Sequence, residues 1–241
     1  MLEAAWWGFV GGAALLVGAV IGIFLPVPGR IVGLVMAFGS GVLISALAFD
    51  LTNEAYDRGG GTAVVLGLLA GSAVFFVGDW FIDRRGGHRR KSSTGHQAGA
   101  GGMALVLGAL LDGIPESAAI GVSLLGGGSV GVAMVTAVFL SNIPESLSAS
   151  TGMKVAGRSM TYVMGLWLAV TAASTVAAAL GFWLLGGASP LAVAVIQAFA
   201  AGAILTMLAD TMLPEAVEHA GQLVGLLAVL GFIAAFLLSA G

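Results

Sequence analysis

Long apolar segments, separated by short glycine- or proline-rich breaks, set the strongest limit on what this chain can fold into. The clearest breaks lie at 26–29, 59–61, 126–128 and 186–187. The segments between the breaks reach the length of about 20 residues that a membrane-crossing helix needs. Because lipid offers no partner for backbone N–H and C=O groups, such segments must satisfy them internally, as a helix does. We therefore predict a polytopic helical membrane protein.

The segmentation predicts eight spans in one all-α transmembrane domain covering residues 1–241. The expected spans are 4–25, 31–53, 62–82, 102–125, 129–151, 160–185, 190–213 and 220–240. The composition agrees, because 59% of the residues are hydrophobic and only 9% are charged. No basic segment precedes the first apolar run, so we expect a span there and not a cleaved signal peptide. The chain contains no cysteine, which excludes disulfides and thiolate metal sites.

The basic residues predict the orientation of the spans. Eight of the nine lysines and arginines fall in the first, third and fifth connections, which share one side of the membrane. Five of them lie in the longest connection, 83–101, which is polar and which we expect to be mobile and cytoplasmic. Both termini are then outside, in what we expect to be a prokaryotic plasma membrane. We expect the basic cluster to act mainly as an orientation signal, and Asp79 to be interfacial.

An internal repeat relates the second and seventh expected spans. The segment 38–41 leads to 54–55 in one span, and the similar segment 199–202 leads to 215–216 in the other, at the same separation. These two spans have opposite directions. The chain is therefore predicted to contain three spans, two central spans and three spans with inverted halves, an arrangement typical of alternating-access transporters.

The two central spans each carry the same short phrase. Residues 111–117 read LDGIPES, and residues 140–146 read LSNIPES. A carboxylate at mid-membrane costs about 2.5–3.5 kcal/mol, so it usually faces an ion, a partner or water. Proline within a helix also leaves a backbone carbonyl without its donor. Each phrase thus offers a carboxylate and a carbonyl at similar depth.

Four polar side chains of these phrases form the candidate metal site. Asp112 and Glu116 are four residues apart, and Asn142 and Glu145 are three apart, so each pair lies on one helical face. Three acids in a low dielectric need a compensating cation or raised pKa values. An all-oxygen donor set suits hard or borderline divalent ions. A proton relay or a hydrogen-bonded structural pair is the alternative.

Further acidic residues lie near the ends of the second and seventh expected spans. They are candidates for the entry and exit of a cation, and interfacial capping of the helix ends is the alternative. The residues are Asp50, Glu54, Asp210, Glu215, Glu218 and His219.

With these motifs the chain resembles the Zrt/Irt-like protein family, the ZIP divalent-metal transporters. The family's fourth and fifth spans carry H-N-x-P-E-G-type phrases, to which 112–117 and 141–146 are similar, and 199–203 through 213–219 is similar to its seventh span. The resemblance covers nearly the whole chain. It implies eight spans, a metal pathway among the second, fourth, fifth and seventh, and a homodimer.

The resemblance also identifies where this chain departs from the family pattern. Glu116, Asn142 and Glu145 carry over directly, whereas Asp112 replaces a histidine. Gly113 replaces an asparagine, the glycine after each glutamate is a serine, and Ser141 stands where histidine or glutamine is common. Our alignment places Ser174 at a glutamate of the sixth span. These changes put a second metal position in doubt.

We therefore expect a divalent-cation transporter that moves Zn²⁺, Fe²⁺ or Mn²⁺ toward the cytoplasm. The metal is its substrate and no cofactor is expected, and its partners are the lipid bilayer and a second copy of the chain, not nucleic acid. A non-transporting homologue is one alternative. An intramembrane acid-dependent enzyme is another, although the chain has no GxGD or HExxH phrase and no nucleophile–base pair.

Overall fold

The computed structural model describes residues 1–241 except 88–89, 92, 95–101, 126–127 and 240–241. The described residues are helical and contain no strand, which confirms the predicted all-α class. The elements are α1 (Leu2–Phe24), α2 (Gly29–Ala46), η1 (Leu47–Thr52), α3 (Asn53–Ile82), η2 (Asp83–Gly87), α4 (Gly102–Ser123), α5 (Gly128–Val155), α6 (Met160–Leu185), α7 (Pro190–Met207), η4 (Leu208–Met212), α8 (Leu213–Ala220) and α9 (Leu223–Ser239).

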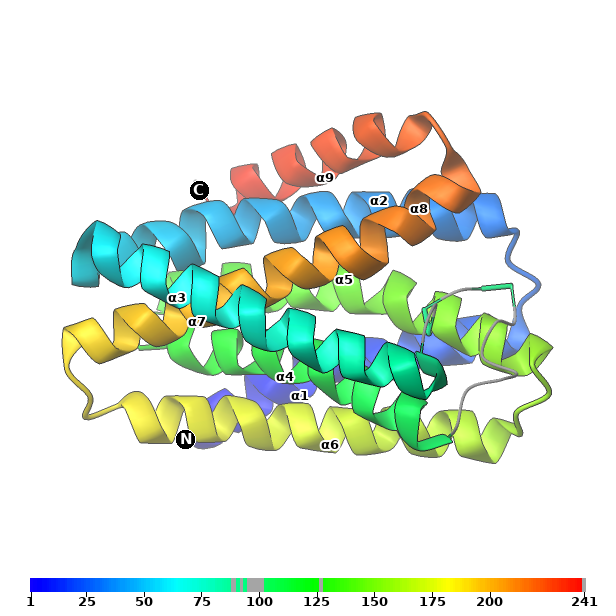
Figure 1. Ribbon diagram of the computed structural model, residues 1–241, viewed down its shortest axis with the longest axis horizontal. Coiled ribbons are helices and arrows are strands. Elements are labelled where there is room, and N and C mark those ends of the chain that lie inside the picture. The colour runs from blue at the N-terminus through cyan, green and yellow to red at the C-terminus, as the bar shows by residue number, and fades with distance from the viewer. Residues whose placement is uncertain (88–89, 92, 95–101, 126–127, 240–241) are drawn as a thin grey trace.

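The helices form one elongated bundle whose members run along its long axis (Figure 1). Met1 and the end of α9 lie at one end of the bundle, and the end of η2 and the start of α4 lie at the other. Five helical segments among the described residues are long and apolar enough to cross a membrane. One of them, Gly29–Gly87, contains the predicted second and third spans. The break expected at 59–61 is a turn at Gly60, whose φ of 72° suits glycine.

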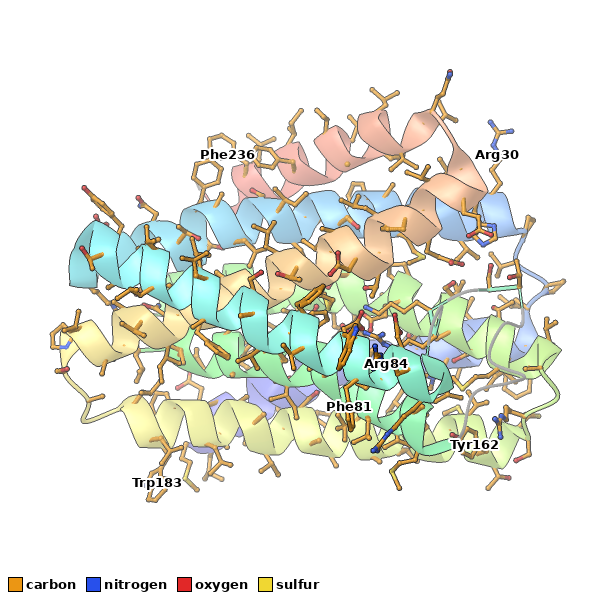
Figure 2. The ribbon with its side chains drawn as sticks, in the orientation of Figure 1. Arg30, Phe81, Arg84, Tyr162, Trp183 and Phe236 are labelled. Atoms are coloured by element: carbon orange, nitrogen blue, oxygen red, sulfur yellow. The ribbon has the colours of Figure 1, made fainter. Side chains whose placement is uncertain are left out.

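Large apolar side chains cover the outside of the bundle, as expected of a protein surrounded by lipid. Trp183 on α6 and Phe236 on α9 both project away from it (Figure 2). Trp183 is 62% exposed and Leu230 is 48% exposed, while small residues fill much of the interior. In water such a surface would promote aggregation, so it indicates an apolar environment.

Close glycine contacts occur twice, in two different helix pairs. In the first pair, a Cβ on Gly41 of α2 would collide with the carbonyl oxygen of Ala228 in α9. In the second, a Cβ on Gly202 of α7 would collide with the carbonyl oxygen of Leu68 in α3. Gly231 against Phe38 and Gly71 against Phe199 repeat the pattern. Such small residues let membrane helices approach closely.

Wide π-helical turns also occur at matching places. η1 follows α2 and η4 follows α7, so that both members of the sequence repeat contain a wide turn at the same separation from their glycines. η1 carries Asp50 and η4 carries Asp210. Such turns are rare and are frequent at functional sites.

The connection 83–101 is described only in part. Its first five residues form η2, and Arg90, Lys91 and Ser93 are buried. Much of the remainder lies outside the described residues, so its mobility stays a prediction.

Candidate functional site

The two proline–glutamate phrases lie inside α4 and α5. Pro115 and Pro144 are both internal to their helices, which continue beyond them. The acids that the sequence singled out are buried: Asp112 is 2% exposed, Glu116 is 1% and Glu145 is 3%. The structure therefore brings three carboxyl groups into the interior of the bundle, where each needs compensation.

Helix α1 holds α5 in place beside these acids. A Cβ on Gly18 would collide with the carbonyl oxygen of Ile143, so the two helices are in close contact. Asn142 Nδ2 donates a hydrogen bond of 3.0 Å to the carbonyl oxygen of Gly11. The amide that the sequence assigned to the metal thus also anchors α5 on α1. Its carbonyl oxygen is the atom left for a ligand role.

The serines at the family's departures have local roles. Ser117 and Ser146 each donate to the carbonyl four residues earlier, those of Gly113 and Asn142, at 2.7 and 2.8 Å. Ser141 is fully buried and donates to the carbonyl oxygen of Val138 at 3.0 Å.

Ser174 of α6 faces α4 and α1 at positions without side-chain bulk. A Cβ on Gly113 would lie 3.5 Å from Ser174 Oγ, and a Cβ on Gly12 would lie 3.3 Å from Ser174 Cβ. The two replaced ligand positions, Gly113 and Ser174, are therefore neighbours. Both carry residues too short to build a second metal position.

Arg90 enters this buried acidic region from the connection between α3 and α4. Its Nε and Nη2 donate to the two Asp112 carboxylate oxygens at 3.2 and 3.0 Å, and Nη1 donates to Asp79. The Arg90 side chain is 5% exposed. Gly108 on α4 makes room for it, because a Cβ at that position would collide with Arg90 Cδ.

Lys91 reaches deeper into the same region. Its Nζ lies 3.1 Å from Glu145 Oε1 and 3.4 Å from Asp112 Oδ2, as ion pairs that are not aligned as hydrogen bonds. Burial alone lowers the pKa of the Lys91 ammonium, but the charges of Asp112 and Glu145 outweigh it and raise that pKa above its ordinary value. Lys91 is therefore a cation at neutral pH.

The acids nevertheless outnumber the bases, and two of their oxygens lack partners. Glu116 Oε1 and Glu145 Oε2 are buried without a hydrogen bond. When ionised, Asp79, Asp112, Glu116 and Glu145 carry four negative charges, against two positive charges from Arg90 and Lys91. A buried polar atom without a partner costs about 1–3 kcal/mol, and more when it is charged. The cluster therefore favours a further positive charge beside Glu116 and Glu145.

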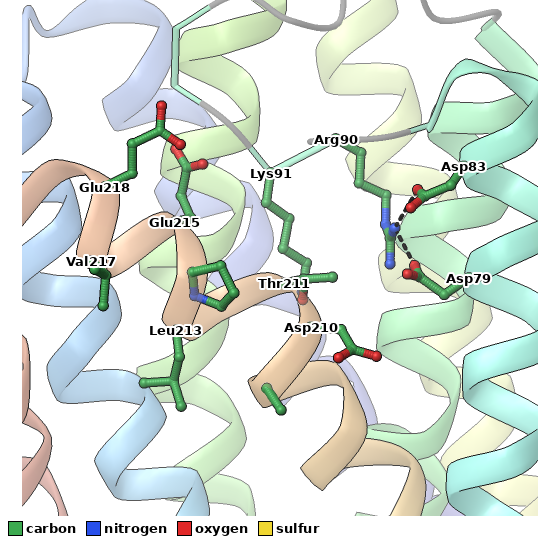
Figure 3. A pocket seen from close by; sticks show the side chains of 12 residues that line it. Asp79, Asp83, Arg90, Lys91, Asp210, Thr211, Leu213, Glu215, Val217 and Glu218 are labelled. Atoms are coloured by element: carbon green, nitrogen blue, oxygen red, sulfur yellow. Dashed lines mark hydrogen bonds and ion pairs between the residues drawn. The ribbon is translucent and has the colours of Figure 1, made fainter.

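A cavity of about 730 Å³ opens beside Arg90 and Lys91 (Figure 3). In this view the two basic side chains lie between the glutamates of α8 and the aspartates of α3. A much smaller cavity, of about 20 Å³, is also lined by Arg90 and Lys91, together with Asp112 and Glu145. The polar residues that line the large cavity are Asp79, Asp83, Arg90, Lys91, Asp210, Thr211, Glu215 and Glu218.

Three hydrogen bonds anchor the segment that carries Arg90 and Lys91. Ser148 Oγ of α5 donates to the Lys91 carbonyl oxygen at 2.5 Å. The Ser93 backbone N–H donates to Glu215 Oε1 at 2.9 Å, and Ser93 Oγ lies 2.9 Å from His219 Nε2. Two residues predicted for cation exit, Glu215 and His219, therefore bind this segment.

The remaining predicted pathway residues lie apart from the three buried acids. Asp50 accepts a hydrogen bond of 2.7 Å from Ser239. Glu54 pairs with Arg58 and accepts 2.9 Å from Gln197, whose Oε1 is buried without a partner. Asp210 and Glu218 are exposed and line the large cavity.

Sequence reasoning missed Arg90 and Lys91 as members of the site and placed Asp79 at the interface. Asp79 is 9% exposed and pairs with Arg90. In this conformation, no three histidine, aspartate or glutamate side chains of the described residues are grouped so as to hold a metal ion. No protein-family model matches the chain, and no curated protein matches it.

Proposed function

We propose that this protein transports divalent metal cations across a membrane and that Glu116 and Glu145 are central to its metal site. The observation that carries the proposal is the pair of buried carboxylate oxygens without partners, Glu116 Oε1 and Glu145 Oε2, on two proline-containing helices. A divalent cation would supply the two positive charges by which the acids exceed the bases. The resemblance of both phrases to the Zrt/Irt-like family supports the same function.

The donor set favours a hard or borderline ion. Asp112, Glu116, Glu145 and the Asn142 carbonyl offer oxygen only, which suits Mn²⁺ and Fe²⁺ at least as well as Zn²⁺. Because Gly113 and Ser174 are neighbours with short side chains, we propose a single metal position. The ion is the substrate of transport, and the large acidic cavity would be its path to or from the buried acids.

We propose eight spans in an inverted 3+2+3 arrangement, with α4 and α5 as the central pair. The repeated glycine contacts of α2 with α9 and of α7 with α3 support related halves, and so do the matching wide turns. The basic connections and the termini lie at opposite ends of the bundle (Figure 1), which supports cytoplasmic basic connections with outside termini. A homodimer in a prokaryotic plasma membrane remains part of the proposal.

A purely structural role for the acids is the second candidate. Arg90 and Lys91 form ion pairs with Asp79, Asp112 and Glu145, as a salt-bridged core of a non-transporting homologue would. In such a core, however, the partners should satisfy one another. The unpartnered oxygens of Glu116 and Glu145 favour the metal site.

The deciding experiment is metal uptake into vesicles that contain the purified protein. Wild type should accumulate Mn²⁺ or Zn²⁺, and the double variant Glu116→Gln/Glu145→Gln should not, because it keeps the side-chain volume but removes two charges. Glu3→Gln, an exposed acid on α1, is the matched control and should transport normally. Unchanged uptake by the double variant would refute the site. Metal binding without uptake by wild type would favour the non-transporting homologue.

A further inference from the structure

Lys91 occupies a position in which its ammonium group can replace the metal. Its Nζ lies 3.1 Å from Glu145 Oε1 and 3.4 Å from Asp112 Oδ2, between two of the carboxylates proposed to hold the ion. A divalent cation and this ammonium group cannot share that space, because both would be in contact with the same oxygens and would repel each other.

The surroundings of Arg90 and Lys91 are built to hold them there. Arg90 is hydrogen-bonded to both Asp112 carboxylate oxygens, and Gly108 leaves the space that its side chain fills. Ser148 holds the Lys91 carbonyl oxygen, and Glu215 holds the Ser93 N–H. The contacts come from α4, α5 and α8, and so are not a chance approach of one surface side chain.

The position of the two side chains also separates the buried acids from the large cavity. Arg90 and Lys91 line both cavities, whereas Asp112 and Glu145 line only the small one among the residues given for either. An ion in the large cavity would therefore meet Arg90 and Lys91 before it met Asp112 or Glu145.

We propose that Lys91 is a tethered competitor of the metal: it inserts between Asp112 and Glu145 when the site is empty and withdraws when a divalent cation binds. The proposal rests on the proposed metal site and adds its regulation. It sets the apparent metal affinity, since binding includes the cost of displacing Lys91. It also provides a positive charge to the acids after the ion leaves.

The first test measures stabilisation by Mn²⁺ of the purified full-length protein in detergent, since a ligand of the folded state raises apparent stability. Lys91→Gln should lower the half-effective Mn²⁺ concentration about tenfold, the factor for a site blocked nine-tenths of the time. Lys154→Gln, at the only other lysine, should leave it unchanged. An equal or higher concentration for Lys91→Gln would overturn the competition.

A second variant perturbs the same contact without changing any charge. Gly108→Ala should displace the Arg90 side chain and with it Lys91, and should also lower the half-effective Mn²⁺ concentration. Gly165→Ala is the matched control, because a Cβ there meets open space. A response of both glycine variants, or of neither, would count against the proposal.

A third measurement follows the segment itself. Ser93→Cys provides a single thiol in a chain without cysteine, at a position that is 8% exposed. Mn²⁺ should accelerate its labelling by a maleimide, and the Glu116→Gln/Glu145→Gln background should abolish this acceleration. No acceleration would overturn the proposal even if Lys91→Gln failed to fold.

The outcomes separate this proposal from the one it rests on. If Mn²⁺ stabilises neither wild type nor Lys91→Gln, the metal site itself is wrong, and the competition with it. If Mn²⁺ stabilises both at the same concentration and the glutamate double variant responds to neither, the metal site stands and the competition by Lys91 is wrong.

Discussion

Asp112→Asn is the substitution whose effect on stability is most informative, because the structure predicts its sign. Asp112 accepts two hydrogen bonds from Arg90 and lies 3.4 Å from Lys91 Nζ. Asparagine keeps one acceptor oxygen but removes the charge, and Arg90 retains Asp79. If Arg90 and Lys91 are inserted in the resting protein, the variant loses free energy of unfolding.

The magnitude follows from these contacts. Breaking a buried ion pair costs about 3–5 kcal/mol, and we expect about 3 kcal/mol because Arg90 retains one partner. For a chain of this size, 1 kcal/mol shifts Tm by about 2–4 °C, so Tm should fall by about 6–12 °C. Asp79→Asn is the comparison: it removes a single hydrogen-bonded partner of Arg90 and should cost about 1–2 kcal/mol.

The assay is thermal unfolding of the two variants and wild type in detergent, with a chelator to remove metal. The opposite sign has an equally clear meaning. Without Arg90 and Lys91 in place, Asp112 would be one of three neighbouring buried acids, and neutralising it would relieve repulsion. A Tm for Asp112→Asn above that of wild type would therefore refute the insertion of this segment in the resting protein.

Three further predictions concern orientation, selectivity and packing. Single cysteines at Lys154 and Gly187 should label from opposite sides of intact cells, and labelling from the same side would contradict the eight-span arrangement. In competition uptake, Mn²⁺ should compete with Zn²⁺, and Asp112→His should shift the preference toward Zn²⁺ because imidazole suits it better; strong Zn²⁺ preference in wild type would contradict the all-oxygen site. Gly202→Ala should lower stability by about 1–3 kcal/mol through overpacking, measured by thermal unfolding, whereas an unchanged Tm would mean that α3 and α7 are not packed this closely.

Periodicity and motif spacing predicted the elements that depend on local sequence. The turn at Gly60, the helix Met160–Leu185 and the positions of the prolines within their helices follow from glycine, proline and apolar run length. Burial of Asp112, Glu116 and Glu145 follows from their places within apolar runs, because the depth of a residue in a span is a linear property of the chain.

The part played by Arg90 and Lys91 does not follow in that way. A polar connection rich in glycine and serine has no apolar period to fix its path, and arginines beside a span are usually orientation signals. The available signal was a charge balance: three acids within two neighbouring spans, with no basic residue in either phrase. The partner had to come from elsewhere, and the nearest basic cluster in sequence precedes Asp112 by about two dozen residues.

The wide turns at η1 and η4 restrict how the chain can change its length. Over the same rise a π turn holds more residues than an α turn, so removing one residue there would rotate all that follows by about 100°. Glu54 would then point away from Gln197, or Glu215 away from Ser93, although both helices would still span the same distance. At these two points the number of residues is therefore set by the direction of a single carboxylate, and not by the thickness of the bilayer.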